Sequence, residues 1–244
     1  MKNLLTLFLL ICSSLTFAQE KIIVEYEFYN VFDLSKETNP KVLEMFKNSN
    51  DQRHYYELVT ADSESHYKKI ERINNSQKLS GATISFGGSG SHYYKNLAEN
   101  VSLAFNDFNG TKLIIKNPIK EMQWIVQKDK STFLGYDIKK ATFKDGNQAY
   151  IAWYTPKISI KNGPDQYGGL PGLILKLEII ETSSDGSESK QIYQATNIKL
   201  DDKVKIEKPT KGKVVSKEEF QKIIKEQSKK FQEMYGNKVE TKID

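Results

Sequence analysis

Residues 136–155, YDIKKATFKDGNQAYIAWYT, contain the pattern that decides the fold. Two runs, 136–144 and 148–155, are rich in β-branched and aromatic residues, which favour strands. Lys144-Asp145-Gly146-Asn147 separates them, and Asp-Gly between two such runs is a strong signal for a hairpin turn. The stretch therefore predicts two antiparallel strands joined by a tight turn.

Strand patterns continue on both sides of this hairpin. In 21–32, the apolar Val24, Tyr26 and Phe28 alternate with Glu25 and Glu27, which indicates a half-buried strand. Further strands are predicted at 55–59, 65–73, 92–94, 101–105, 113–115, 124–126, 173–180 and 191–200. A short helix is expected at 42–46, and the Asn-, Ser- and Gly-rich segment 74–91 is predicted to be a long mobile loop.

The C-terminal segment has a helical pattern instead. Ser216 and Glu219 form a capping box, apolar residues follow at helical spacing, and Gly236 supplies a stop. We expect this amphipathic helix to cover the sheet, with 208–212 as a hinge before it. The predicted fold class is α+β: about nine to eleven antiparallel strands with one C-terminal helix.

The N-terminus has the features of an export signal. Lys2 precedes an apolar run that begins at Leu4, and Thr16 and Ala18 place small residues before Gln19. The run is shorter than the roughly 20 apolar residues of a transmembrane helix. We therefore expect a signal peptide at 1–18, a single domain at 19–244 and no transmembrane anchor after cleavage. The expected location is the periplasm, with outer-membrane association or release into the medium as alternatives.

Cys12, the only cysteine, leaves a lipoprotein signal as an alternative, although Ile11 before it is larger than such signals favour. Cleavage at Gln19 would leave no disulfide, so the core alone would stabilise the domain. The net charge of +5 is spread along the chain, whereas nucleic-acid binding requires a clustered basic face. No nucleic-acid partner is expected.

The sequence contains few catalytic patterns. His54, His66 and His92 have no spacing typical of a metal site, so no metal or other cofactor is expected. The acidic pairs Glu178 with Glu181, and Asp201 with Asp202, fall at strand edges or turns where water surrounds them. No catalytic residue is predicted from these patterns.

The most unusual stretch is 153–175, WYTPKISIKNGPDQYGGLPGLIL. Its glycines and prolines describe a loop of fixed shape that is longer than a hairpin requires. Such a loop is either a binding surface or a structural crossover. Its motif residues are Gly163, Pro164, Gly168, Gly169, Leu170, Pro171, Gly172, Leu173 and Ile174.

The order of these residues resembles the GLPGLI family, a group of exported proteins of Bacteroidetes-type bacteria. Trp124, Leu134-Gly135-Tyr136, Lys140-Ala141 and Ala152-Trp153-Tyr154-Thr155 precede the motif in the expected order. Ile138 stands where members often have a cysteine. The resemblance implies export and a shared fold but no defined activity. The sheet with its Trp-bearing hairpin also resembles the half-barrels of periplasmic lipoprotein carriers.

Two functions are compatible with this pattern. The first is a non-enzymatic binding or accessory protein, in which Trp124, Tyr136, Trp153 and Tyr154 contact a lipid, a hydrophobic peptide or an outer-membrane partner. An accessory subunit would show an exposed apolar patch bordered by the motif loop. The alternative is an extracytoplasmic hydrolase that uses carboxylate or hydroxyl groups near 156–172, where Lys157, Lys161 and Asp165 are the charged residues.

Overall fold

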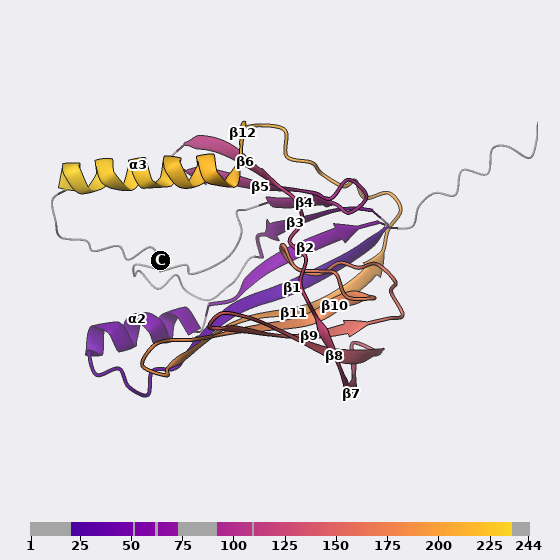
Figure 1. Ribbon diagram of the computed structural model, residues 1–244. Helices are drawn as coiled ribbons and strands as arrows, with labels where there is room; N and C mark the ends of the chain where they lie inside the picture. Colours follow the sequence, from indigo (N-terminus) through magenta and orange to yellow (C-terminus); the bar gives the residue numbers. More distant parts are fainter. Residues whose placement is uncertain (1–20, 51, 62, 73–91, 109, 236–244) are drawn as a thin grey trace, which may run out of the picture.

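The fold is one large, strongly twisted sheet with two helices at one end (Figure 1). The computed structural model describes residues 21–50, 52–61, 63–72, 92–108 and 110–235. Twelve strands form a single sheet in this part of the chain, in the order β12-β6-β5-β4-β3-β2-β1-β11-β10-β9-β8-β7. The strand-rich α+β class predicted from the sequence is confirmed.

Two consecutive meanders build this sheet. The first is β1 (Ile22–Phe32), β2 (His54–Thr60), β3 (Glu64–Ile70), β4 (His92–Asn96), β5 (Val101–Phe108) and β6 (Thr111–Asn117). The chain then crosses to the opposite edge and returns through β7 (Ile125–Phe133), β8 (Tyr136–Asp145), β9 (Gln148–Thr155), β10 (Leu173–Thr182) and β11 (Glu188–Leu200). Because β11 pairs with β1, the two meanders form one continuous antiparallel sheet.

The edge next to β6 differs from the prediction. Residues Lys213–Val215 form β12, which pairs parallel to β6, so the sheet is mixed and has one strand more than the predicted upper limit. The segment was interpreted as part of a connection because a three-residue strand is too short to show a period-2 pattern. Val215 is buried and joins the cluster of Leu113 and Ile115.

The two helices contact the sheet only in part. Helix α2 (Pro40–Asn50) extends the short helix expected at 42–46, and Phe46 packs against Phe32 of β1 with ring centroids 4.8 Å apart. Helix α3 (Lys217–Tyr235) begins with the predicted capping box, in which Ser216 Oγ accepts from the Glu219 amide at 3.1 Å.

Helix α3 does not cover the sheet as expected. Phe220 and Ile223, in its first two turns, pack against the β6–β12 edge, and the helix then extends beyond the sheet (Figure 1). The prediction was wrong because an apolar stripe shows which side of a helix is apolar but not where its axis lies. The predicted signal peptide (1–18), the predicted mobile loop (74–91) and Gly236 lie outside the described residues.

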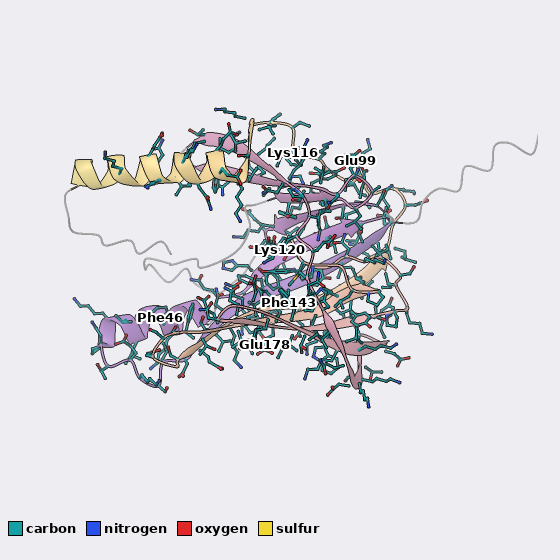
Figure 2. The ribbon with its side chains drawn as sticks, viewed as in Figure 1. Phe46, Glu99, Lys116, Lys120, Phe143 and Glu178 are labelled. Carbon is teal, nitrogen blue, oxygen red and sulfur yellow. The ribbon has the colours of Figure 1, made fainter. Side chains whose placement is uncertain are left out.

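The core follows the alternation predicted for β1. Val24, Tyr26 and Phe28 are at most 2% exposed, whereas Glu25 and Glu27 on the opposite face form ion pairs with arginine side chains. The segment between β6 and β7 passes the β8–β9 turn, where Nζ of Lys120, labelled in Figure 2, lies 2.8 Å from Asp145 Oδ2. This crossing places Trp124 next to Phe143 of β8, with ring centroids 6.0 Å apart.

Candidate functional site

The motif loop, residues 156–172 between β9 and β10, folds back on itself and onto the sheet. Asn162 and Gly168 form an isolated antiparallel bridge, and the Gly169 amide donates to the Lys161 carbonyl at 3.1 Å. The amides of Leu173 and Ile174, at the start of β10, donate to the carbonyls of Ile158 and Asn162. The loop therefore has the fixed shape that its glycines and prolines predicted.

Two glycines allow this close packing. Gly172 has φ of +151°, and a Cβ atom there would lie 2.2 Å from the Thr155 carbonyl oxygen. A Cβ atom at Gly163 would lie 2.9 Å from Cβ of Ile174. Backbone therefore lies against backbone at Gly172, and a side chain at either position would displace the loop.

A buried lysine of β4 forms hydrogen bonds to the backbone of the loop. Lys95 is 2% exposed, and its Nζ donates to the Tyr167 carbonyl at 2.9 Å and to the Gly163 carbonyl at 3.5 Å. Burial lowers the pKa of Lys95 to about 7, although nearby Asp165 acts in the opposite direction. A second polar contact joins the Asn162 side-chain amide to Thr60 Oγ1 at 3.2 Å.

Asp165 of the loop is buried among tyrosines. It is 3% exposed, its φ is +51°, and it hydrogen bonds the Tyr193 hydroxyl group. Burial raises the pKa of Tyr193 and of Tyr67 well above 10, and the Asp165 charge contributes in the same direction. The Tyr67 hydroxyl group is buried without a hydrogen-bond partner among the described residues. Titratable groups thus converge under the loop, but in close packing rather than in an open cleft.

Sequence reasoning missed Lys95, because lysine in a short strand next to Asn96 is typical of an exposed edge. The strand period offered a weak signal of burial. Tyr93 and Lys95 are two residues apart and therefore lie on the same face of β4, and Tyr93 is a core residue. Lys157 and Lys161, the other charged loop residues, are exposed.

The four aromatic residues predicted as a ligand surface occupy two regions. Trp124 is half-buried, donates from Nε1 to the Gly168 carbonyl at 2.9 Å, and packs on the cluster that contains the buried Tyr154. Tyr136 and Trp153 are half-buried and pack on the other large cluster of the core. Trp153 also lines a cavity of about 170 Å³ with Tyr29 and Lys176.

The remaining motif residues belong mainly to the core. Leu170, Leu173 and Ile174 are at most 1% exposed, and the Ile174 carbonyl accepts from the Tyr26 hydroxyl group at 2.5 Å. Pro171 and Gly169 are exposed, whereas Pro164 is buried.

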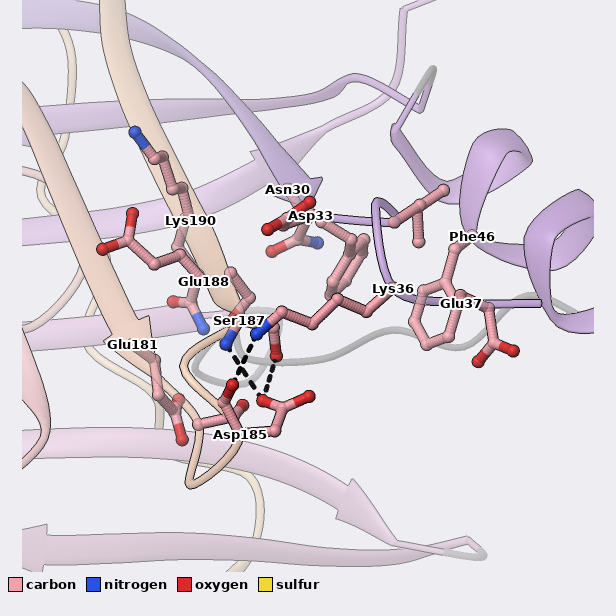
Figure 3. A pocket seen from close by; sticks show the side chains of 15 residues that line it. Asn30, Asp33, Lys36, Glu37, Phe46, Glu181, Asp185, Ser187, Glu188 and Lys190 are labelled. Carbon is pink, nitrogen blue, oxygen red and sulfur yellow. Dashed lines mark hydrogen bonds between the residues drawn. The ribbon is translucent and has the colours of Figure 1, made fainter. Parts of the chain in front are cut away.

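An open cavity lies elsewhere, where β1 ends beside the β10–β11 turn. It measures about 420 Å³, and Phe32, Leu34 and Phe46 give it an apolar wall. Figure 3 shows Lys36 reaching to the turn, where its Nζ donates to the Asp185 carbonyl at 2.5 Å. We call this cavity the end pocket. Its charged lining residues are Asp33, Glu37, Glu181, Asp185 and Glu188, opposed by Lys36 and Lys190.

Local hydrogen bonds already engage most of these charges. Asp33 and Asp185 accept from Ser35 and Ser187 respectively, and these bonds lower the pKa of both carboxyl groups. Lys190 pairs with Glu178 at 3.2 Å. Within the described residues, the Glu188 carboxylate has no such partner, so it is available to a ligand. The five carboxylates outnumber the two lysines, which favours a ligand with positive charge and an apolar part.

The described residues contain no group of three or more His, Cys, Asp or Glu side chains that could hold a metal ion. In the same residues, neither helix has the length and apolar character needed to cross a bilayer.

Comparison with known proteins provides a family match without an activity. A family model described as "Protein of unknown function (Porph_ging)" matches residues 107–176, from the end of β5 through the motif loop to the start of β10. No curated protein matches the chain.

Solved structures show similarity of fold. PNGF-II, in its C2 and P21 crystal forms, superposes with a TM-score of 0.53 and 18% identity over 84% of this chain. The matched part is 32% or 33% of PNGF-II, so the chain spans about a third of that protein's length. A LolA superfamily protein, NE2245 from Nitrosomonas europaea, matches 80% of this chain and 89% of its own with a TM-score of 0.28 and 9% identity, which is too low to carry an argument.

Proposed function

We propose that the protein is an exported, non-enzymatic binding or accessory protein of the GLPGLI type, and that its ligand is a peptide segment of an envelope partner. The end pocket carries this proposal. It is open, has an apolar wall of Phe32, Leu34 and Phe46, and has an excess of carboxylates in a chain of net positive charge. A peptide with a basic side chain beside an apolar one fits both features.

The core beneath the motif loop supports the proposal that the loop stabilises the fold and does not itself bind the ligand. Leu170, Leu173 and Ile174 are at most 1% exposed and belong to the packed core, so we place binding at the surface. Ile125 and Val126 on the edge strand β7 are 65% and 51% exposed and provide a small apolar patch for a partner. Trp153, with its cavity of about 170 Å³, is a second contact point among the predicted aromatics.

Binding of a basic peptide tests the end pocket. Calorimetric titration with the peptide Lys-Phe-Lys should show binding, and Glu-Phe-Glu should show none. Glu188→Gln should weaken binding by about tenfold, since one charge-assisted contact of about 1.4 kcal/mol is lost. Glu44→Gln removes the same charge from an exposed site on α2 outside the pocket and should have no effect.

Equal affinity of Lys-Phe-Lys for both variants and for the unmodified protein would exclude the end pocket as its site. Binding of Glu-Phe-Glu with the same affinity would show that the carboxylates do not select the ligand.

A hydrolase remains the alternative, and the convergence of Lys95, Asp165 and tyrosine hydroxyl groups favours it. A lysine with a pKa of about 7 can act as a proton acceptor near neutral pH. Substrate could reach these groups only if the motif loop lifted from the sheet. Rapid amide exchange across 156–172 would therefore support a hydrolase over a binding protein.

A further inference from the structure

A second candidate site lies under the strap, residues 201–212 between β11 and β12. Two histidines hold the strap at the backbone of one residue, Glu207. The Glu207 amide donates to His66 Nδ1 at 2.8 Å, and His92 Nε2 lies 2.9 Å from the Glu207 carbonyl oxygen. Ile206 packs next to this point against the cluster of Tyr94, Leu103 and Ile114. The strap is therefore seated on the sheet at a defined position.

The hydrogen bonds determine which ring nitrogens carry protons. His66 Nδ1 accepts, so its Nε2 bears the proton of the neutral ring; a carbonyl oxygen only accepts, so His92 Nε2 donates. The buried His66 Nε2 has no acceptor among the described residues. Burial lowers the pKa of His66 to about 4 and that of His92 below its usual value. Positive charge at this site therefore comes from lysines.

The strap and the sheet border an open, shallow cavity of about 530 Å³ that we call the strap pocket. Lys68, Lys69, His92 and Phe105 line it from the sheet, and residues 207–211 line it from the strap. Glu207 is the single carboxylate in this lining, and Lys68 Nζ already pairs with it at 2.8 Å.

The other cations of the strap pocket have no carboxylate partner within the described residues. These are Lys69, Lys208 and Lys211, and the Lys208 ammonium lies 5.4 Å from the Tyr94 ring centroid. Phe105 and Pro209 contribute apolar surface to the same lining. Uncompensated positive charge beside apolar surface is complementary to an anion attached to an apolar body.

We propose that the strap pocket binds an anionic amphiphile, a molecule with a phosphate or carboxylate headgroup on an apolar chain. Lys208 and Lys211 contact the headgroup, and Phe105 with Pro209 contacts the start of the chain. The strap pocket shares no lining residue with the end pocket, which selects positive charge, so the two sites are independent. A solvated surface of unrelated lysines is the competing explanation, and it predicts binding governed by net charge alone.

Titration with dodecyl phosphate below its micelle concentration tests this proposal. The expected result is one site per chain, weakened by about tenfold or more in Lys208→Gln/Lys211→Gln, because two charge-assisted contacts are lost. Lys128→Gln/Lys130→Gln removes the same charge from exposed positions on β7, at the opposite edge of the sheet, and should bind as the unmodified protein does. Circular dichroism of each variant checks that the fold is retained.

Three further probes separate the alternatives. Inorganic phosphate should bind much more weakly than dodecyl phosphate, and dodecyltrimethylammonium should not bind at the strap pocket. Equal losses in both double variants would overturn the proposal in favour of net charge, and so would equal affinity for inorganic phosphate. Vesicles of phosphatidylglycerol distinguish a membrane source of the headgroup from a free amphiphile: competition by vesicles supports the former, and its absence the latter.

Discussion

Single residues explain why the motif loop keeps its shape. Gly172 is the clearest case because a methyl group there would overlap the Thr155 carbonyl oxygen. Gly172→Ala should destabilise the protein by about 3 kcal/mol or more, since strain and steric overlap add. Gly169→Ala is the matched control: φ is +87°, but the nearest atom is Trp124 Nε1 at 4.0 Å.

Gly169→Ala should lower the free energy of unfolding by only about 1 kcal/mol. Urea unfolding of both variants measures the difference. If the two losses are equal, the close approach at Gly172 is not what holds the loop.

The buried lysine makes stability depend on pH. Burial lowers the pKa of Lys95 from 10.5 to about 7, so between these values the unfolded chain binds a proton that the folded protein has released. The free energy of unfolding should therefore rise with pH across this range. Lys95→Met should reduce that rise, whereas Lys208→Met on the exposed strap should not. Chemical unfolding at about pH 7 and pH 9, below the titration of unfolded tyrosines, measures both.

Gly172 and Lys95 also show how far single residues can be interpreted from the sequence alone. Gly172 could be recognised as special because glycine beside proline in a long connection is itself a conformational signal. For Lys95 the strand alternation offered only a weak signal, because its burial depends on a loop some 70 positions away that nothing in Tyr93-Tyr94-Lys95 indicates. Residue type predicts local conformation better than it predicts distant neighbours.

At the scale of elements, the central hairpin was predicted well and isolated elements poorly, and the strand predicted at 124–126 covers only the first two residues of β7 (Ile125–Phe133). The turn at Asp145-Gly146 and the strands on either side of it lie where their local pattern placed them. The direction of α3 and the pairing of β12 depend on contacts with β6, roughly 100 positions earlier in the chain. A local pattern contains no information about such contacts.

The motif loop and α3 should differ in dynamics. The loop is tied to the sheet through Lys95 and Asn162, whereas the described side chains of α3 that pack on the sheet belong to its first turns. In hydrogen exchange, amides of 158–174 that donate within the fold should be protected nearly as well as β1, and amides in the second half of α3 should exchange rapidly. Rapid exchange across the loop would contradict its structural role and favour the hydrolase.

The whole molecule combines a packed core beneath the motif loop with two open pockets, the end pocket and the strap pocket, whose linings carry opposite net charge. The family match covers the segment between β6 and β7, the strands β7–β9 at one edge of the sheet and the motif loop, and it includes no lining residue of either pocket. The shared motif thus accounts for a scaffold, and the residues that would select a ligand lie outside it. This arrangement explains why the sequence indicated a fold more clearly than a function.

The central claim is that the mature protein binds a partner segment through the end pocket. Native mass spectrometry of the protein, purified gently from a cell envelope, tests it most directly. We expect a chain that begins at Gln19 and carries a reproducible additional mass, which is reduced in Glu188→Gln and unchanged in Glu44→Gln. A bare mature chain in every preparation, or an additional mass that persists equally in both variants, would contradict the account.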